Sequence, residues 1–184
     1  MRLLKADAEG LAACAKILNS GGVAVIPTDT VYGLAAHPAF PGAVARLYSI
    51  KERARTKPIA LLAADIDSVT AFGGILCAKA RKLAARGWPG ALTLVLPANG
   101  TCEGFRVPDS PWTRELLKAT GGVLRATSAN ISGDAPAICA ETAEKLDADV
   151  IIDGGPAQKG LASTVIKVDA AGGVEILRQG PFSP

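Results

Sequence analysis

Three small polar side chains follow a buried apolar run near the start of the chain. Thr28, Asp29 and Thr30 come soon after residues 23–26 (VAVI), which predict a buried strand. Hydroxyl and carboxylate groups at a strand end suit a small polar ligand, because a rigid sheet presents chemistry through the loops at its strand ends. A polar turn that only closes the strand would have the same composition. From its local sequence alone, the stretch 27–34 (PTDTVYGL) could therefore be either a ligand-binding loop or a structural turn.

A basic segment follows between a predicted helix and a predicted strand. Pro41 suits the first turn of the helix, and Pro58 separates the segment from the apolar run 59–62. The cationic side chains in between are Lys51, Arg53, Arg55 and Lys57. In a loop these charges can converge on one anion, whereas the commoner alternative is a solvated basic loop.

Two further groups of polar residues lie on or after predicted strands. Arg106 lies among apolar neighbours in the short strand 105–108, so it needs either a structural ion pair or an anionic ligand. Residues 127–133 (TSANISG) end a strand that begins at Val123. Their hydroxyl, amide and backbone N–H groups can wrap a phosphate or a carboxylate. A purely structural turn would use the same residue types.

Polar side chains also flank the last two predicted strands. Ser163 opens the strand 163–168, and Arg178 lies near the end of the strand 175–180. Cations and hydroxyls, the groups that bind a nucleotide phosphate or a carboxylate, thus lie at several strand ends. The residues predict an anion-binding cavity in which catalysis would come from positioning and charge neutralisation, without a protein nucleophile.

The remaining elements predict the fold class. Asp7 can cap a helix that runs to about Leu18. Further helices are expected at 75–86 and 112–119, a strand at 91–97, and a strand with its turn at 149–155. Because helices and strands are mixed along the whole length, the pattern indicates an α/β or α+β sheet protein. No helix is predicted between residues 91 and 108, so part of the sheet should be antiparallel. The basic outer face of the helix 75–86 is interpreted as a solvated surface.

The bulk composition bounds the class of protein. The 184 residues suffice for one domain, 1–184, and 49% apolar with 20% charged residues indicates a globular chain. The net charge of +3 does not by itself imply a polyanionic partner, and 4% aromatic residues argue against the stacking platforms of single-stranded nucleic-acid binders. No segment has the pattern of a signal peptide or the roughly 18 apolar residues of a membrane span. A cytoplasmic protein without membrane contact is therefore expected.

Metal-centred and triad chemistry have little support in the sequence. The four cysteines (Cys14, Cys77, Cys102 and Cys139) have no CxxC spacing, and His37 is the single histidine. A zinc site or a Ser/His/Asp triad is therefore not expected. The cysteines predict free thiols in a reducing compartment.

Taken together, five stretches resemble the YrdC/Sua5 family of L-threonylcarbamoyladenylate synthases. In the family's order they are 27–34 (PTDTVYGL), 51–58 (KERARTKP), 105–108 (FRVP) with the preceding WPGALTLVLP, 127–133 (TSANISG), and 163–165 (STV) followed by 177–180 (LRQG). Each stretch is weak alone. Their joint occurrence, over about residues 10–181, is specific.

The resemblance implies a YrdC-like fold, a twisted open sheet of parallel and antiparallel strands flanked by helices around a basic cavity. It implies the short, TsaC-like form, without the C-terminal domain of the longer Sua5 members. The implied reaction converts L-threonine, bicarbonate (or CO2) and ATP into threonylcarbamoyl-AMP and pyrophosphate, with Mg2+ held mainly by the nucleotide phosphates. A partner system would then transfer the group to adenosine 37 of tRNAs that read ANN codons. The resemblance leaves a direct contact of this chain with tRNA or other RNA open.

The family pattern also implies roles for individual residues. Thr30, Arg106 and Ser163 would bind threonine, with Arg106 taking the carboxylate. Lys51 and Arg53 would stabilise negative charge at the reacting phosphates. The full implied ATP-binding set is Lys51, Arg53, Lys57, Ser128, Asn130, Ser132, Pro136 and Arg178.

Three departures from the family pattern concern the threonine end of the cavity. Leu62 stands where some members have a histidine near threonine, His37 lies in an unusual continuation of the first motif, and Arg125 precedes the TSAN stretch. Two rival functions also stay open. One is a module that binds double-stranded RNA or a ribosomal precursor through phosphate contacts, without chemistry. The other is a carbamoyl-transfer domain detached from a larger maturation protein, which would lack a threonine preference.

Overall fold

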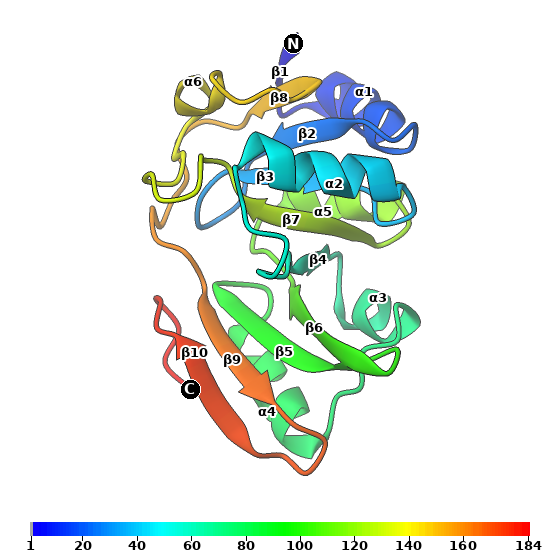
Figure 1. Cartoon of the computed structure of the whole chain (residues 1–184), viewed down its shortest axis with the longest axis vertical. Helices are drawn as coiled ribbons and strands as arrows, with labels where there is room; N and C mark the ends of the chain where they lie inside the picture. Colours follow the sequence, from blue (N-terminus) through cyan, green and yellow to red (C-terminus); the bar gives the residue numbers. More distant parts are fainter. Residues whose placement is uncertain (1) are drawn as a thin grey trace.

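A computed structural model describes residues 2–184 as one ten-stranded mixed sheet flanked by helices (Figure 1). The strand order is β1-β8-β2-β3-β7-β4-β6-β5-β9-β10. The strands are β1 (Arg2–Lys5), β2 (Val23–Ile26), β3 (Gly33–Ala36), β4 (Leu61–Ala63), β5 (Leu92–Ala98), β6 (Thr101–Arg106), β7 (Val123–Ser128), β8 (Val150–Asp153), β9 (Thr164–Val168) and β10 (Val174–Arg178). The helices are α1 (Ala8–Leu18), α2 (Pro41–Ile50), α3 (Ile66–Ala71), α4 (Ala78–Gly87), α5 (Pro111–Ala119) and α6 (Ala140–Ala143). The predicted mixed sheet with flanking helices is confirmed.

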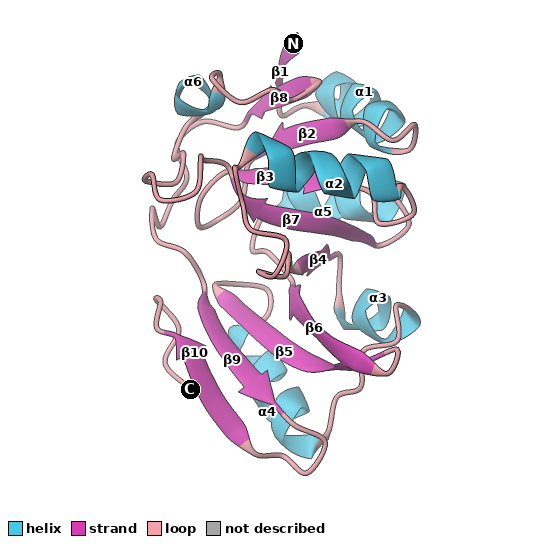
Figure 2. Cartoon of the chain, viewed as in Figure 1, coloured by secondary structure: helices cyan, strands magenta, loops and turns pink. Residues whose placement is uncertain are grey.

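The half of the sheet around β2, β3, β7 and β8 is covered on both faces (Figure 2). Helices α1 and α5 pack on one face, where Leu18 and Leu116 meet Ile26. Helix α2 packs on the other, where Leu47 meets Leu34. This double cover explains why every residue of β2 and β3 is buried.

The other half of the sheet is covered by helices on one face. Leu83 of α4 packs against Phe105 and Ile166, which belong to β6 and β9. Gly104 and Val165, the neighbours of Phe105 and Ile166 along their strands, line a cavity on the opposite face. The predicted antiparallel part lies here, because β5 and β6 form a hairpin with Leu94 paired to Phe105.

Local sequence signals fix several helix ends. The Oδ1 of Asp7 accepts a hydrogen bond from the backbone N–H of Gly10 at 2.9 Å and caps α1 as predicted. Pro41 occupies the first turn of α2, and Ser110 caps α5. Among the helices in residues 2–184, none is long and apolar enough to cross a membrane.

Some boundaries differ from the sequence-based expectation. The predicted strand 59–62 is shifted to Leu61–Ala63, because the carbonyl of Ile59 accepts a hydrogen bond from the Arg125 side chain. The predicted helix 75–86 begins only at Ala78, since the N–H of Ile75 donates to the Pro97 carbonyl at the end of β5. Four elements, β1, β3, α3 and α6, were not predicted. Strand β3 contains only Gly, Leu and Ala, which carry little strand signal.

Arg125 ties the two halves of the sheet together beside the short strand β4. Its guanidinium donates to both carboxylate oxygens of Glu103, at 2.5 and 2.6 Å, and to the Ile59 carbonyl at 2.9 Å. Arg125 lies on β7 and Glu103 on β6, the two neighbours of β4 in the sheet. Both side chains are 19% exposed. The bridge therefore braces the sheet where β4 is only three residues long.

We predict that Arg125→Met destabilises the fold by about 2 kcal/mol, because the half-buried carboxylate of Glu103 loses its partner. Urea unfolding at pH 7 measures the change. The double variant Arg125→Met/Glu103→Met should recover part of the loss, because no unpaired charge is left behind. A single variant as stable as the wild type would contradict this bracing role.

Candidate functional site

A cavity of about 340 Å³, the central cavity, is lined by residues from both halves of the sheet. Its polar lining residues include Thr28, Thr30, Arg53, Thr93, Arg106, Thr127, Ser128, Ser163 and Arg178. Within residues 2–184, three arginines and no carboxylate side chain belong to this lining. The wall therefore favours an anionic ligand.

The loop after β2 and the end of β6 meet in a buried network at this wall. The guanidinium of Arg106 donates from Nε to the Gly90 carbonyl at 2.9 Å and from Nη1 to the Thr30 hydroxyl at 2.7 Å. Its Nη2 donates to Oδ1 of Asp29, which is completely buried. Burial lowers the pKa of Arg106, and the neighbouring Asp29 raises it again.

Arg106 thus has the structural ion pair that the sequence analysis gave as one of two alternatives. The other alternative stays compatible with the geometry, since Arg106 also lines the central cavity. A guanidinium has five N–H donors, and the three bonds above leave two for a ligand. Asp29, which the sequence analysis mentioned only as part of the loop, is the residue that orients Arg106.

Lys51 lies behind the wall of the central cavity. It is 1% exposed, and its Nζ donates to the carbonyls of Ser128 and Asn130, at 2.5 and 2.8 Å, and to the side-chain Oδ1 of Asn130 at 2.8 Å. Burial and the nearby Arg53 lower the pKa of Lys51 to about 8. The ammonium therefore holds the turn 128–130 in place, and its implied contact with ATP phosphates stays a prediction.

The other implied ATP-binding residues divide into two groups. Arg53, Ser128 and Arg178 line the central cavity. The residues outside the lining are Lys57, Asn130, Ser132 and Pro136. Asn130 is buried and donates through Nδ2 to the carbonyls of Ile131 and Asp134, so it shapes its own turn.

Ser163 reaches the wall from the start of β9. Its hydroxyl lies 2.8 Å from the hydroxyl of Thr93, and its carbonyl accepts bonds from Nε and Nη2 of Arg178 at 3.0 and 2.8 Å. Burial, followed by the charge of Arg53, lowers the pKa of Arg178. Thr93 was missed by the sequence analysis, although a lone hydroxyl inside the apolar strand 91–97 was a usable signal.

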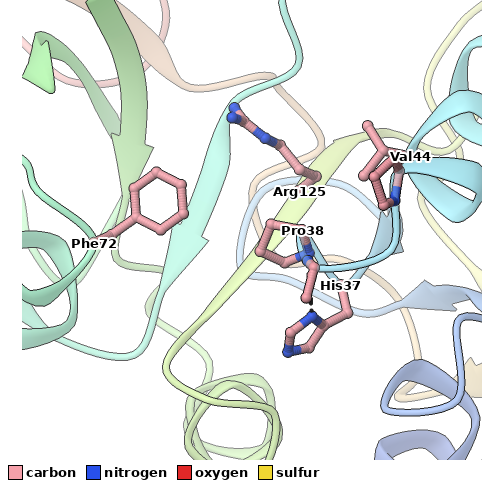
Figure 3. Close-up of a pocket in the computed structure, with 7 residues that line it drawn as sticks. His37, Pro38, Val44, Phe72 and Arg125 are labelled. Carbon is pink, nitrogen blue, oxygen red and sulfur yellow. Dashed lines mark hydrogen bonds between the residues drawn. The ribbon is translucent and has the colours of Figure 1, made fainter. Parts of the chain in front are cut away.

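Of the three residues that depart from the family pattern, His37 and Arg125 lie outside the lining of the central cavity. His37, Pro38, Val44, Phe72 and Arg125 line a separate open pocket (Figure 3). The Nδ1 of His37 accepts a hydrogen bond from the Ala39 N–H at 3.1 Å. Leu62, in contrast, does line the central cavity, so it is the departure that bears on ligand recognition.

The four cysteines are free, and burial raises the pKa of Cys14 to about 12, which makes it an inert core residue. Within the described residues, no group of three or more His, Cys, Asp or Glu side chains could hold a metal ion.

We predict that the stability difference between the wild type and Lys51→Met depends on pH. The pKa of Lys51 is about 8 in the folded chain and near 10.5 when unperturbed, so the unfolded chain binds more protons between these values. The wild type should therefore gain stability relative to the variant as the pH rises through this window, by roughly 2–3 kcal/mol in all. Urea unfolding of both proteins from pH 7 to 10 measures this difference in the free energy of unfolding. A difference that does not change with pH would contradict a buried ammonium.

Known proteins match both the sequence and the fold. The family model Sua5/YciO/YrdC, described as "Telomere recombination", matches residues 16–180. The chain is 36% identical over 170 residues to the threonylcarbamoyl-AMP synthase of Bacillus subtilis, which covers 85% of this chain and 49% of that protein. It is 31% identical over 190 residues to the threonylcarbamoyl-AMP synthase of Bos taurus, and the match covers 94% of this chain and 68% of that protein.

Among solved structures, P. abyssi Sua5 complexed with L-threonine superposes with a TM-score of 0.88 at 29% identity, covering 97% of this chain and 57% of that one. The chain thus spans about half the length of the B. subtilis and P. abyssi proteins. The family match covers most of the sequence, including all five motif stretches. The chain belongs to the Sua5/YciO/YrdC family.

Proposed function

We propose that the chain is a threonylcarbamoyl-AMP synthase, which forms threonylcarbamoyl-AMP and pyrophosphate from L-threonine, bicarbonate (or CO2) and ATP. The observation that carries the proposal is the concentration of like charges around one cavity. Burial is the largest cause of the lowered pKa values of Lys51, Arg106 and Arg178, and charge repulsion adds to it. Arg53 acts in this way on Lys51 and Arg178, and Arg178 acts on Arg106. A polyanion in the cavity would relieve this repulsion. The names of the B. subtilis and Bos taurus relatives support the same activity.

The lining of the central cavity suits two substrates. Thr30, Arg106 and Ser163 offer hydroxyls and a guanidinium for a small hydroxy amino acid, and the assignment of L-threonine to them is supported by the P. abyssi relative. Arg53 and Arg178 offer guanidinium groups for phosphates. A cavity that holds both ligands would bring their reacting atoms together, which lowers the barrier by positioning.

The chemistry then needs no covalent bond to the protein. The threonine nitrogen attacks the carbon of bicarbonate, and loss of water gives a carbamate. A carbamate oxygen attacks the α-phosphorus of ATP, and the bond to the bridging oxygen breaks to release pyrophosphate. Arg53 and Arg178 would stabilise the negative charge that moves onto the leaving group.

Mg2+ would have no protein site of its own in this cavity. The lining has no carboxylate and no histidine among the described residues, so the ion's ligands would be nucleotide oxygens. Bound in this way, it would neutralise phosphate charge. We also propose that a separate system transfers the product to adenosine 37 of tRNA, and that the protein is cytoplasmic.

A direct assay tests the activity. Purified protein is incubated with ATP, bicarbonate and L-threonine, and released pyrophosphate and the threonylcarbamoyl nucleotide are measured. We expect release that depends on threonine. A module that only binds RNA would give none, and a general carbamoyl-transfer domain would show no preference for threonine, so either result would overturn the proposal.

We predict that Arg106→Ala raises the threonine KM by at least about 30-fold and leaves the ATP KM within about threefold, because it removes the charged donor beside the Thr30 hydroxyl. Circular dichroism checks that the variant is folded. Arg81→Ala, an exposed arginine on α4, is the matched control and should leave both constants unchanged. An unchanged threonine KM in a folded Arg106→Ala protein would exclude Arg106 from the threonine site.

A further inference from the structure

We propose that Lys159 is a positioning residue for the substrate carboxylate, acting through Asp29 and Arg106. This inference rests on the proposed function and concerns the same cavity. The Nζ of Lys159 donates to Oδ2 of Asp29 at 3.0 Å, while Arg106 binds Oδ1 of the same carboxylate. Lys159 lies outside the five motif stretches, so no role was predicted for it.

Lys159 lies in the middle of the connector between β8 and β9, residues 154–163. These strands hold the second and ninth positions of the sheet, so the connector passes from one half to the other (Figure 1). Near its start, Tyr32 Oη donates to the Gly155 carbonyl at 2.7 Å, and the Ala157 N–H donates to the Ile138 carbonyl at 2.7 Å.

The second half of the connector forms part of the cavity wall. Ala162 and Ser163 line the central cavity. The Lys159 N–H also donates to the Asp29 carbonyl at 3.1 Å, so this lysine contacts Asp29 through both main chain and side chain. The two contacts hold the connector against the loop that carries Thr30.

The charges explain why a second cation matters at this point. Asp29 and Arg106 alone form a neutral buried pair, and such a pair attracts a carboxylate ligand only weakly. Lys159 adds one positive charge to the same carboxylate, so the cluster of three has a net charge of +1. With Lys159 in place, Arg106 can keep its ion pair with Asp29 and still present excess positive charge to an incoming carboxylate.

The position of Lys159 makes it suitable for substitution. Its side chain is 35% exposed, whereas Asp29 is completely buried and Arg106 nearly so. Removing the ammonium therefore leaves the core packing intact and keeps the main-chain contact to Asp29. A change in threonine affinity would then report on charge rather than on unfolding.

The test compares four full-length proteins: the wild type, Lys159→Met, Lys159→Arg and the control Lys118→Met. Lys118 is an exposed lysine on α5 that pairs with Glu115 and makes no bond to Asp29 or Arg106, so its substitution removes the same charge outside this network. Threonine-dependent pyrophosphate release gives kcat and the KM values for threonine and for ATP. Thermal unfolding of each protein checks that the fold is retained.

We expect Lys159→Met to raise the threonine KM roughly tenfold, the effect of one charge acting over about 10 Å at an effective dielectric constant near 20. The ATP KM and kcat should change less than about twofold, Lys159→Arg should restore the threonine KM, and Lys118→Met should match the wild type. A general role in ordering the connector would instead change kcat and both KM values, because Ser163 and Arg178 lie on the same wall.

The outcomes distinguish a failure of the Lys159 proposal from a failure of the proposed synthase activity. A threonine KM that is unchanged in Lys159→Met, or a parallel change in all three constants, overturns the role of Lys159 alone. A failure of Lys159→Arg to restore the KM overturns it as well. The absence of threonine-dependent release from the wild type overturns the proposed function, and this inference with it.

Discussion

The ion pair between Asp29 and Arg106 is the interaction on which the site depends. Asp29 comes from the loop after β2 and Arg106 from the end of β6, so the pair joins the two halves of the sheet at the wall of the central cavity. Both groups are buried, and either charge left alone there would be costly. The pair therefore fixes the distance between the loop and the strand. Thr30 is included in this arrangement, because its hydroxyl accepts a bond from the same guanidinium.

Around this pair, the chain holds cations in place without neutralising them. Lys51 donates to carbonyls of the turn 128–130, Arg53 to the carbonyls of Lys57 and Pro58, and Arg178 to the carbonyl of Ser163. Carbonyl oxygens orient a cation but carry no net charge, so the positive potential of the cavity is retained. A carboxylate at each position would fix the side chains equally well and would cancel the field that an anionic substrate needs.

The fold was largely predictable because its main elements carry strong local signals. Asp7 and Pro41 correctly predicted the starts of α1 and α2, and the apolar run 91–97 predicted β5 to within a residue at each end. The elements that were missed lack such signals: β3 is built from small residues and is a strand because β2 and β7 pair with it on both sides. The shift of β4 depends on a bond from Arg125, which comes from a distant part of the chain. Tertiary contacts of this kind leave no trace in the local sequence.

The site was predictable to the level of motifs and not to the level of individual contacts. Lys51 and Arg53 stand two residues apart in one basic segment, yet only Arg53 lines the central cavity. The reason is geometric: Lys51 caps the C-terminus of α2 and points into the turn 128–130, whereas Arg53 lies beyond the helix, in the loop that borders the cavity. A motif records that both cations are present, but the direction of each depends on where the helix ends. Supporting residues such as Lys51 and Asp29 therefore become distinguishable from wall residues only when the burial of each charge and its acceptors are known.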